Sequence, residues 1–109
     1  MKTLQNDLTT IEQSKRLLEL GVPKNSANNY YGKDGKLHYI DGTIPYSLLW
    51  ETGCTPCWSV GRLMEIYDLC TGKVATNVMY CEEEYVLGII TAIEAAVKYN
   101  YIDFSKLEE

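Results

Sequence analysis

The sequence has little positive charge and no apolar run long enough to cross a membrane. Its 109 residues include 10 Lys and Arg against 15 Asp and Glu, so the formal net charge is −5. A field of this sign repels phosphate backbones and anionic lipid headgroups, which disfavours nucleic-acid and membrane-surface partners. The first residues also lack the apolar segment of a secretory signal. We therefore expect a cytoplasmic protein that binds neither nucleic acid nor membranes.

The usual signatures of catalysis are also missing. The chain contains no phosphate-binding glycine loop, no dinucleotide-binding glycine pattern and no zinc-protease motif. Its one histidine, His38, lies between Leu37 and Tyr39 and is better explained as a strand residue than as a catalytic base. These absences favour a non-enzymatic protein without a cofactor.

The composition is that of one globular domain. The apolar fraction is 46% and the charged fraction is 23%, and the chain shows no repeat, linker or low-complexity segment. A chain of this length buries roughly two thirds of its unfolded surface around a single core. We predict one domain over residues 1–109, with loosely ordered termini at 1–7 and 103–109.

The first predicted helix spans about residues 10–20. Thr9 and Glu12 have the spacing of a capping box, in which the threonine accepts from the backbone and the glutamate reaches back. Gly21 can supply the left-handed residue after the helix, and Pro23 cannot continue it.

Two further helices are predicted. One runs from about Pro56 to Leu69, with Thr55 as N-cap, and the following Thr71-Gly72 terminates it. The last helix has the strongest periodicity, with acidic residues 82–84 at its start and Glu94 spaced to pair with Lys98. Its apolar positions fall on one arc: Val86, Ile89, Ile90, Ile93, Ala96 and Val97.

A β-hairpin is predicted between the first two helices. Residues 30–32 and 36–40 flank Lys33-Asp34-Gly35, which suits a tight turn. Residues 44–50 are expected to be extended, and 73–80 to form another strand. This order predicts an α+β domain, with a small, mainly antiparallel sheet of about three strands packed by three helices in a single layer on one face.

The segment Cys54-Thr55-Pro56-Cys57 is the most suggestive motif for chemistry. A C-x-x-C at a helix N-terminus can hold a thiolate of low pKa, as thiol-redox enzymes require. However, no buried strand directly precedes the motif, and no proline follows Pro56 to form the cis-proline loop of a thioredoxin-like site. Redox catalysis is therefore an alternative rather than the favoured interpretation.

The four cysteines also allow a zinc site to be considered. Cys54, Cys57, Cys70 and Cys81 are enough in number for tetrahedral ligation, but a second close pair is missing. On the predicted second helix Cys57 and Cys70 share an apolar arc with Leu63 and Tyr67. Packing in the core is the favoured interpretation of these two thiols.

Aromatic residues are abundant, with nine tyrosines and two tryptophans. Tyrosine combines a large contact area with a polar group and few rotamers, which suits partner binding. The candidates cluster around the predicted hairpin and its exit: Tyr30, Tyr31, Tyr39, Tyr46 and Trp50. The alternative is that these side chains pack across the sheet against the helices.

Four segments stand out together: residues 8–14, the Leu17 to Gly21 stretch, Ser26-Ala27, and the Pro-x-Trp-Ser-x-Gly-x-Leu segment at 56–63. In this order they resemble a family of short uncharacterised proteins from gut anaerobic bacteria and their phages or mobile elements. The resemblance implies no known activity. From the residues themselves we expect a structural role for Pro56, Trp58 and Ser59, beside the helix-terminal residues Thr9, Glu12 and Gly21.

We therefore predict a small acidic protein-interaction module of a phage, a mobile element or its host. Its partner is an unidentified protein or a second copy of the chain. One alternative is a thiol-redox or zinc-binding protein centred on Cys54 and Cys57. Another is an acidic inhibitor that mimics DNA, although the carboxylates show no periodic spacing.

Overall fold

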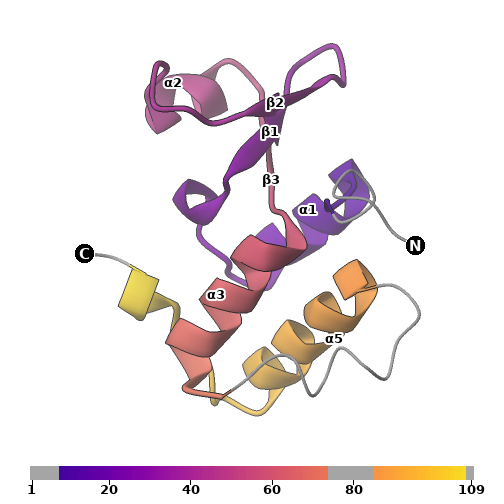
Figure 1. The fold of residues 1–109 in the computed structure, drawn as a ribbon, viewed down its shortest axis with the longest axis vertical. Coiled ribbons are helices and arrows are strands. Elements are labelled where there is room, and N and C mark those ends of the chain that lie inside the picture. The colour runs from indigo at the N-terminus through magenta and orange to yellow at the C-terminus, as the bar shows by residue number, and fades with distance from the viewer. Residues whose placement is uncertain (1–7, 74–84, 108–109) are drawn as a thin grey trace.

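The computed structural model describes residues 8–73 and 85–107 and shows an α+β fold, as predicted (Figure 1). Residues 74–80 of the strand predicted at 73–80, and the acidic residues 82–84, lie outside the described residues. The elements in chain order are α1 (Ile11–Glu19), η2 (Lys24–Ser26), β1 (Asn29–Tyr31), β2 (Leu37–Tyr39), α2 (Tyr46–Glu51), β3 (Thr55–Cys57), α3 (Val60–Thr71), α5 (Tyr85–Lys98) and η3 (Phe104–Leu107).

Helix α1 has its capping box one residue later than predicted. The Thr10 hydroxyl accepts from the backbone N–H of Gln13 at 3.1 Å, and the Gln13 side chain accepts from the Thr10 N–H at 2.9 Å. The prediction of Thr9 and Glu12 was wrong because Thr9 is drawn into the core, where its side chain has other partners.

The end of α1 follows the prediction. Gly21 has φ +100°, in the left-handed region that glycine adopts without a steric cost. Its N–H bonds to the Leu18 carbonyl and the Val22 N–H bonds to the Leu17 carbonyl, the pattern of a Schellman motif. Helix α1 therefore stops where the sequence indicates.

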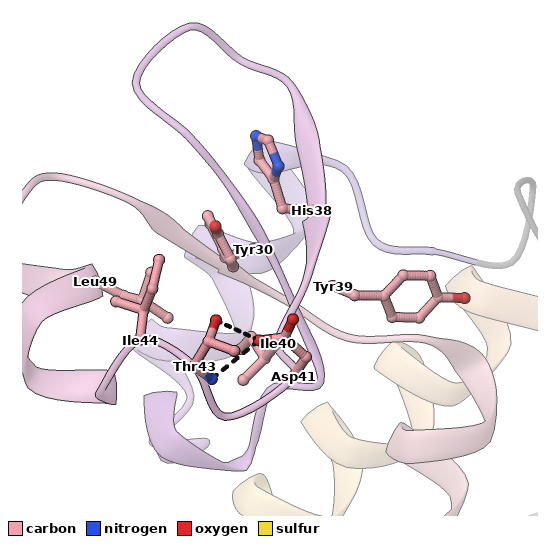
Figure 2. A pocket seen from close by; sticks show the side chains of 8 residues that line it. All are labelled: Tyr30, His38, Tyr39, Ile40, Asp41, Thr43, Ile44 and Leu49. Atoms are coloured by element: carbon pink, nitrogen blue, oxygen red, sulfur yellow. Dashed lines mark hydrogen bonds between the residues drawn. The ribbon is translucent and has the colours of Figure 1, made fainter.

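The predicted hairpin is present, and its first strand, β1, is the central strand of a three-stranded antiparallel sheet in the described part of the chain. The strand order is β2-β1-β3, and Tyr30 is the register partner of both His38 and Pro56. Side chains alternate between the two faces, so Tyr30 and His38 share one side of the hairpin while Tyr39 points away from them (Figure 2).

The segment predicted to start the second helix is a strand. Thr55–Cys57 pairs with β1 as an edge strand, and α3 begins only at Val60, with Ser59 as its N-cap. The Ser59 hydroxyl accepts from the Arg62 N–H at 3.2 Å. Alternation of the ladder places the Pro56 nitrogen on the outer edge, where no N–H is needed. The end of α3 at Gly72, with φ +73°, agrees with the prediction.

The extended conformation predicted for residues 44–50 is also wrong, because Tyr46–Glu51 form helix α2. Pro45 stands before it as N-cap, and its carbonyl accepts from the N–H groups of Leu48 and Leu49. Leu49 is the buried residue of this short helix. A proline just before a helix is as compatible with a helix start as with an edge strand.

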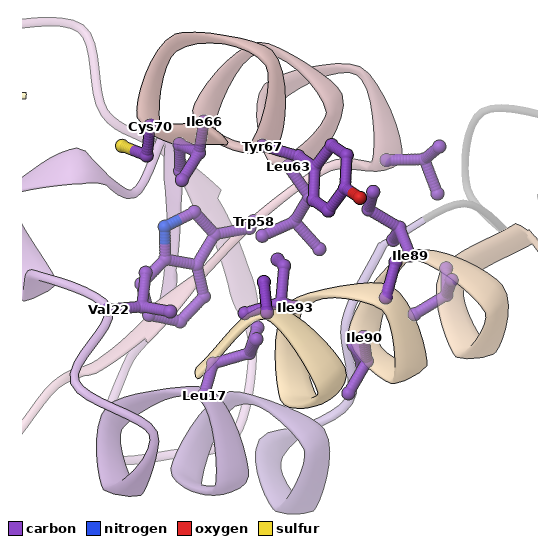
Figure 3. Packing of buried hydrophobic residues seen from close by; sticks show 14 of the residues in the cluster. Leu17, Val22, Trp58, Leu63, Ile66, Tyr67, Cys70, Ile89, Ile90 and Ile93 are labelled. Carbon is purple, nitrogen blue, oxygen red and sulfur yellow. The ribbon is translucent and has the colours of Figure 1, made fainter. Parts of the chain in front are cut away.

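The core lies mainly between helices. Helices α1, α3 and α5 pack around Trp58, and α1 contacts the sheet through β3 (Figure 3). The apolar arc predicted for the last helix is confirmed, with Val97 only partly buried. The largest fully buried side chains here are Leu17, Trp58, Leu63, Ile66, Ile89 and Ile93.

Two contacts at the edge of the core differ from expectation. The Glu94 carboxylate pairs with Arg16 of α1, with Nη2 at 2.6 Å, so it joins two helices instead of bridging locally to Lys98. Residues 103–107, which we expected to be loosely held, include η3 and lie against α3. The Asp103 N–H donates to the Cys70 carbonyl at 2.9 Å.

Candidate interaction surface

Cys57 lies in a buried hydrogen-bonded cluster between β3 and the residues before α1. Its thiol donates to the Thr9 carbonyl at 3.3 Å and accepts from the Thr9 hydroxyl at 3.5 Å. The same hydroxyl accepts from the Trp58 N–H at 3.1 Å and lies 2.8 Å from the Ser14 hydroxyl. The Tyr31 hydroxyl donates to the Thr9 carbonyl at 2.7 Å. This cluster fastens the start of α1 to the sheet.

The environment of Cys57 opposes thiol reactivity. Burial raises the pKa of Cys57, although hydrogen bonds with Thr9 and Tyr31 act in the opposite direction. The pKa of Tyr31 is raised to about 12, first by burial and then by the neighbouring Cys57. Since the thiolate is the reactive form, these shifts are opposite to those of a redox cysteine.

The remaining cysteines assemble no metal site in the part of the chain that the structure describes. Cys54 is half-buried with its sulfur 3.6 Å from the Thr52 hydroxyl, and Cys70 is buried in the core. Cys54, Cys57 and Cys70 are free thiols. Residues 8–73 and 85–107 contain no group of three His, Cys, Asp or Glu that could hold a metal ion, and Cys81 lies outside them. Cys57 and Cys70 are both buried, as the core interpretation predicts, but Cys57 lies on β3 and not on the helical arc from which its burial was inferred.

A second polar cluster joins η2 to the start of α3. The Asn28 side chain accepts from the Ser59 N–H at 3.1 Å and donates to the Ser59 hydroxyl at 2.9 Å. The Arg62 Nε donates to the Ser26 carbonyl at 2.8 Å, and the Trp58 indole donates to the Ser26 hydroxyl at 3.0 Å. Ser26 and Trp58-Ser59, which are more than 30 residues apart in the chain, are thus joined by hydrogen bonds between η2 and the start of α3.

Burial falls steeply across one face of the sheet, from β3 to β2. Cys57, Asn29 and Tyr39 are register neighbours on the three strands, and their exposed fractions are 0%, 2% and 79%. Leu37 is on the same face as Tyr39 and is 42% exposed. The protein therefore covers this face at β3 and β1 and leaves it open at β2.

The outer edge of β2 is also unpaired among the described residues. Strand β1 is its one neighbour in the sheet. The Lys36 carbonyl and the Ile40 N–H both bond to the β1 side of the hairpin. Because these directions alternate along a strand, the backbone N–H and C=O groups of Leu37 and Tyr39 point outward.

The opposite face of the hairpin is partly closed by α2. The Tyr30 and His38 rings stack there, with centroids 5.0 Å apart and an angle of 19° between their planes. They line a shallow cavity of about 270 Å³ with residues of the following loop and α2 (Figure 2). The lining residues are Tyr30, His38, Tyr39, Ile40, Asp41, Thr43, Ile44 and Leu49.

Exposed apolar side chains follow β2 into this loop and α2. Ile44 at the cavity and Leu48 on α2 are both exposed. We call Leu37, Tyr39, Ile44 and Leu48 the hairpin surface. It combines open apolar groups with an unpaired strand edge.

Of the five aromatic residues predicted to bind a partner, Tyr39 is the one that the structure exposes. The hydroxyl of Tyr46 reaches the Ala27 carbonyl at 3.4 Å, and the Trp50 indole donates to Asn25 at 2.8 Å. These internal hydrogen bonds hold two side chains that we expected to be available to a partner. The half-buried members of the set are Tyr30, Tyr31, Tyr46 and Trp50.

Sequence reasoning missed the aliphatic part of the hairpin surface. Leu37 stands two residues before Tyr39, so the predicted strand already placed both on one face. Ile44 and Leu48 gave no such signal, because their segment was assigned the wrong secondary structure.

No helix in residues 8–73 and 85–107 is long and apolar enough to cross a membrane. Comparisons of the chain with protein-family models, with curated proteins and with solved structures find no match.

Proposed function

We propose that this chain is a non-enzymatic protein-interaction module that acts in the cytoplasm and binds its partner through the hairpin surface. The observation that carries the proposal is β2, whose three residues are all exposed while its outer edge has no strand partner among the described residues. Such an edge is a template for pairing with another chain.

The side chains of the hairpin surface support the same conclusion. A row of apolar groups beside an open edge gives an added chain both backbone hydrogen bonds and side-chain contacts. Tyr39 presents most of its ring to solvent, and tyrosine is enriched at protein interfaces. Leu37 and Tyr39 expose apolar groups on one face of the edge strand, and Ile44 and Leu48 expose others beyond its opposite face.

Thiol or zinc chemistry has weaker support. Cys57 is buried in β3 rather than at a helix N-terminus, and its thiol donates a hydrogen bond to the Thr9 carbonyl. Elemental analysis and thiol titration across pH test this alternative. Bound zinc, or a Cys57 thiolate near neutral pH, would support the thiol or zinc alternative.

The proposal is tested by comparing Tyr39→Asp with Tyr99→Asp. Both tyrosines are well exposed, at 79% and 67%, but Tyr99 lies just beyond α5 and outside the hairpin surface. Each variant and the wild type are immobilised for capture from host lysate, and each is sized in solution by light scattering. We expect binding or self-association that Tyr39→Asp abolishes and Tyr99→Asp retains. A wild-type chain that stays monomeric and captures nothing contradicts the proposal.

A further inference from the structure

We propose that the occupant of the β2 edge is a second copy of this chain, paired antiparallel through its own β2 about a two-fold axis at His38. The inference rests on the proposed function and names the partner of that surface. The result is a continuous six-stranded sheet in the order β3-β1-β2-β2-β1-β3.

The backbone of β2 is self-complementary in this register. Leu37 and Tyr39 direct their N–H and C=O groups outward, and His38 directs its groups to β1. When two copies meet with His38 opposite His38, each Leu37 faces the Tyr39 of the other copy. In each such pair the outward N–H and C=O groups of Leu37 face those of Tyr39 in the other copy. All four residues therefore form backbone hydrogen bonds across the new pair of strands.

The side chains match in the same register. An antiparallel pair placed about a two-fold axis normal to the sheet keeps the same face up in both copies. Leu37 of one copy then lies beside Tyr39 of the other on the face that the helices leave open. Aliphatic and aromatic side chains directly opposite one another are a favourable cross-strand pair. A shift by one residue would instead place Leu37 opposite Ile40 and lose this match.

Charge also favours a second copy. The chain as a whole carries −5, but residues 33–41 contain two lysines, Lys33 and Lys36, and two aspartates, Asp34 and Asp41, so this edge has no net charge. Lys36 precedes β2 and Asp41 lies just beyond it. In this register Lys36 lies opposite Ile40 of the other copy and Asp41 lies opposite Gly35, so at each end of the pair Lys36 is one position away from Asp41 of the other copy.

A charge-swap experiment tests this arrangement. Lys36→Glu alone places a carboxylate near Asp41 of the second copy, and Asp41→Lys alone places two ammonium groups together. We expect each variant to self-associate about ten-fold more weakly than the wild type, because two exposed contacts become repulsive. An equimolar mixture of the two variants restores unlike charges at both contacts and should associate as the wild type does.

Sedimentation equilibrium from about 10 μM to about 1 mM gives the dissociation constants. Lys15→Glu is the matched control, since Lys15 is an exposed lysine on α1, and should associate as the wild type does. The Asp41 side chain accepts from the Thr43 N–H and hydroxyl, so circular dichroism checks that Asp41→Lys is folded. Recovery in the mixture is the second check on folding.

Three results would overturn the pairing: a monomeric wild type over this range, a dimer that Lys36→Glu does not weaken, or single variants that fail to recover on mixing. A monomer that still captures another protein through Tyr39 would leave the proposed function intact and assign the edge to a different partner.

Discussion

The indole N–H of Trp58 donates a 3.0 Å hydrogen bond to the hydroxyl of Ser26, which lies 32 residues earlier in the chain. Ser26 in turn donates to the Pro23 carbonyl at 2.5 Å. Trp58 is fully buried at the centre of the helical core, and Ser26 is nearly so. A single hydroxyl therefore gives the largest core side chain its polar partner and fixes η2 against the start of α3.

Ser26→Ala should destabilise the protein by about 1–3 kcal/mol, because it leaves a buried indole N–H without an acceptor. Urea denaturation followed by Trp fluorescence measures the loss. Ser47→Ala is the matched control, since Ser47 is exposed on α2 and should stay within about 0.5 kcal/mol of the wild type. Equal effects of the two substitutions would show that the hydrogen bond contributes nothing.

Thr9→Val should cost more stability than Thr10→Ala. The valine keeps the shape of Thr9 but deprives the Trp58 N–H and the Ser14 hydroxyl of a partner, a loss of about 2 kcal/mol or more. Thr10→Ala removes the N-cap of α1, worth about 1 kcal/mol. Denaturant unfolding of both variants gives the order. The reverse order would mean that Thr9 acts mainly at the helix end.

Local signals in the sequence predicted the elements whose determinants are themselves local. The Gly21 and Gly72 helix ends, the hairpin turn at Lys33-Asp34-Gly35 and the apolar arc of α5 are all present. The predictions were wrong where a residue distant in the chain determines the local structure. Thr55–Cys57 becomes a strand because β1, some 25 residues earlier, pairs with it. Thr9 does not cap α1 because its hydroxyl accepts a hydrogen bond from the Trp58 N–H.

The candidate surface was predictable only in part for the same reason. Tyr39 could be placed on a strand face from its position in the hairpin. The internal roles of Tyr31 and Trp50 could not, because their hydrogen-bond acceptors, Thr9 and Asn25, are more than 20 residues away. Exposure of Leu37 depends on where the helices stop covering the sheet, which alternation along one strand does not reveal.

Stability should fall as the pH rises above about 9. Burial raises the pKa of Cys57, and that of Tyr31 is raised from 10.0 to about 12. Above about pH 9 the unfolded chain releases protons that the folded protein retains. The stabilisation that these groups provide is therefore complete below about pH 9, and it is lost as the pH rises through their pKa values in the folded protein.

Free energies of unfolding between about pH 7.5 and 11, measured under reducing conditions, test this prediction. Burial also raises the pKa of Cys70, and that of Tyr67 is raised to about 12. Tyr31→Phe removes one of these groups and should therefore reduce the decline above about pH 10 without abolishing it. Stability that stays constant over the whole range would contradict the burial of these groups.

If the hairpin surface serves binding, its side chains should contribute little to the free energy of unfolding. Tyr39→Thr replaces an exposed strand residue with another residue of high β-propensity and should change the free energy of unfolding by less than about 0.5 kcal/mol. Leu49→Ala, on the buried side of α2, should cost about 2 kcal/mol or more. Denaturant unfolding of both variants at a concentration where the wild type is monomeric separates the two roles. A large cost for Tyr39→Thr in the monomer would assign the ring to packing within the domain, since an exposed ring can stabilise a fold only through contacts that its own chain provides.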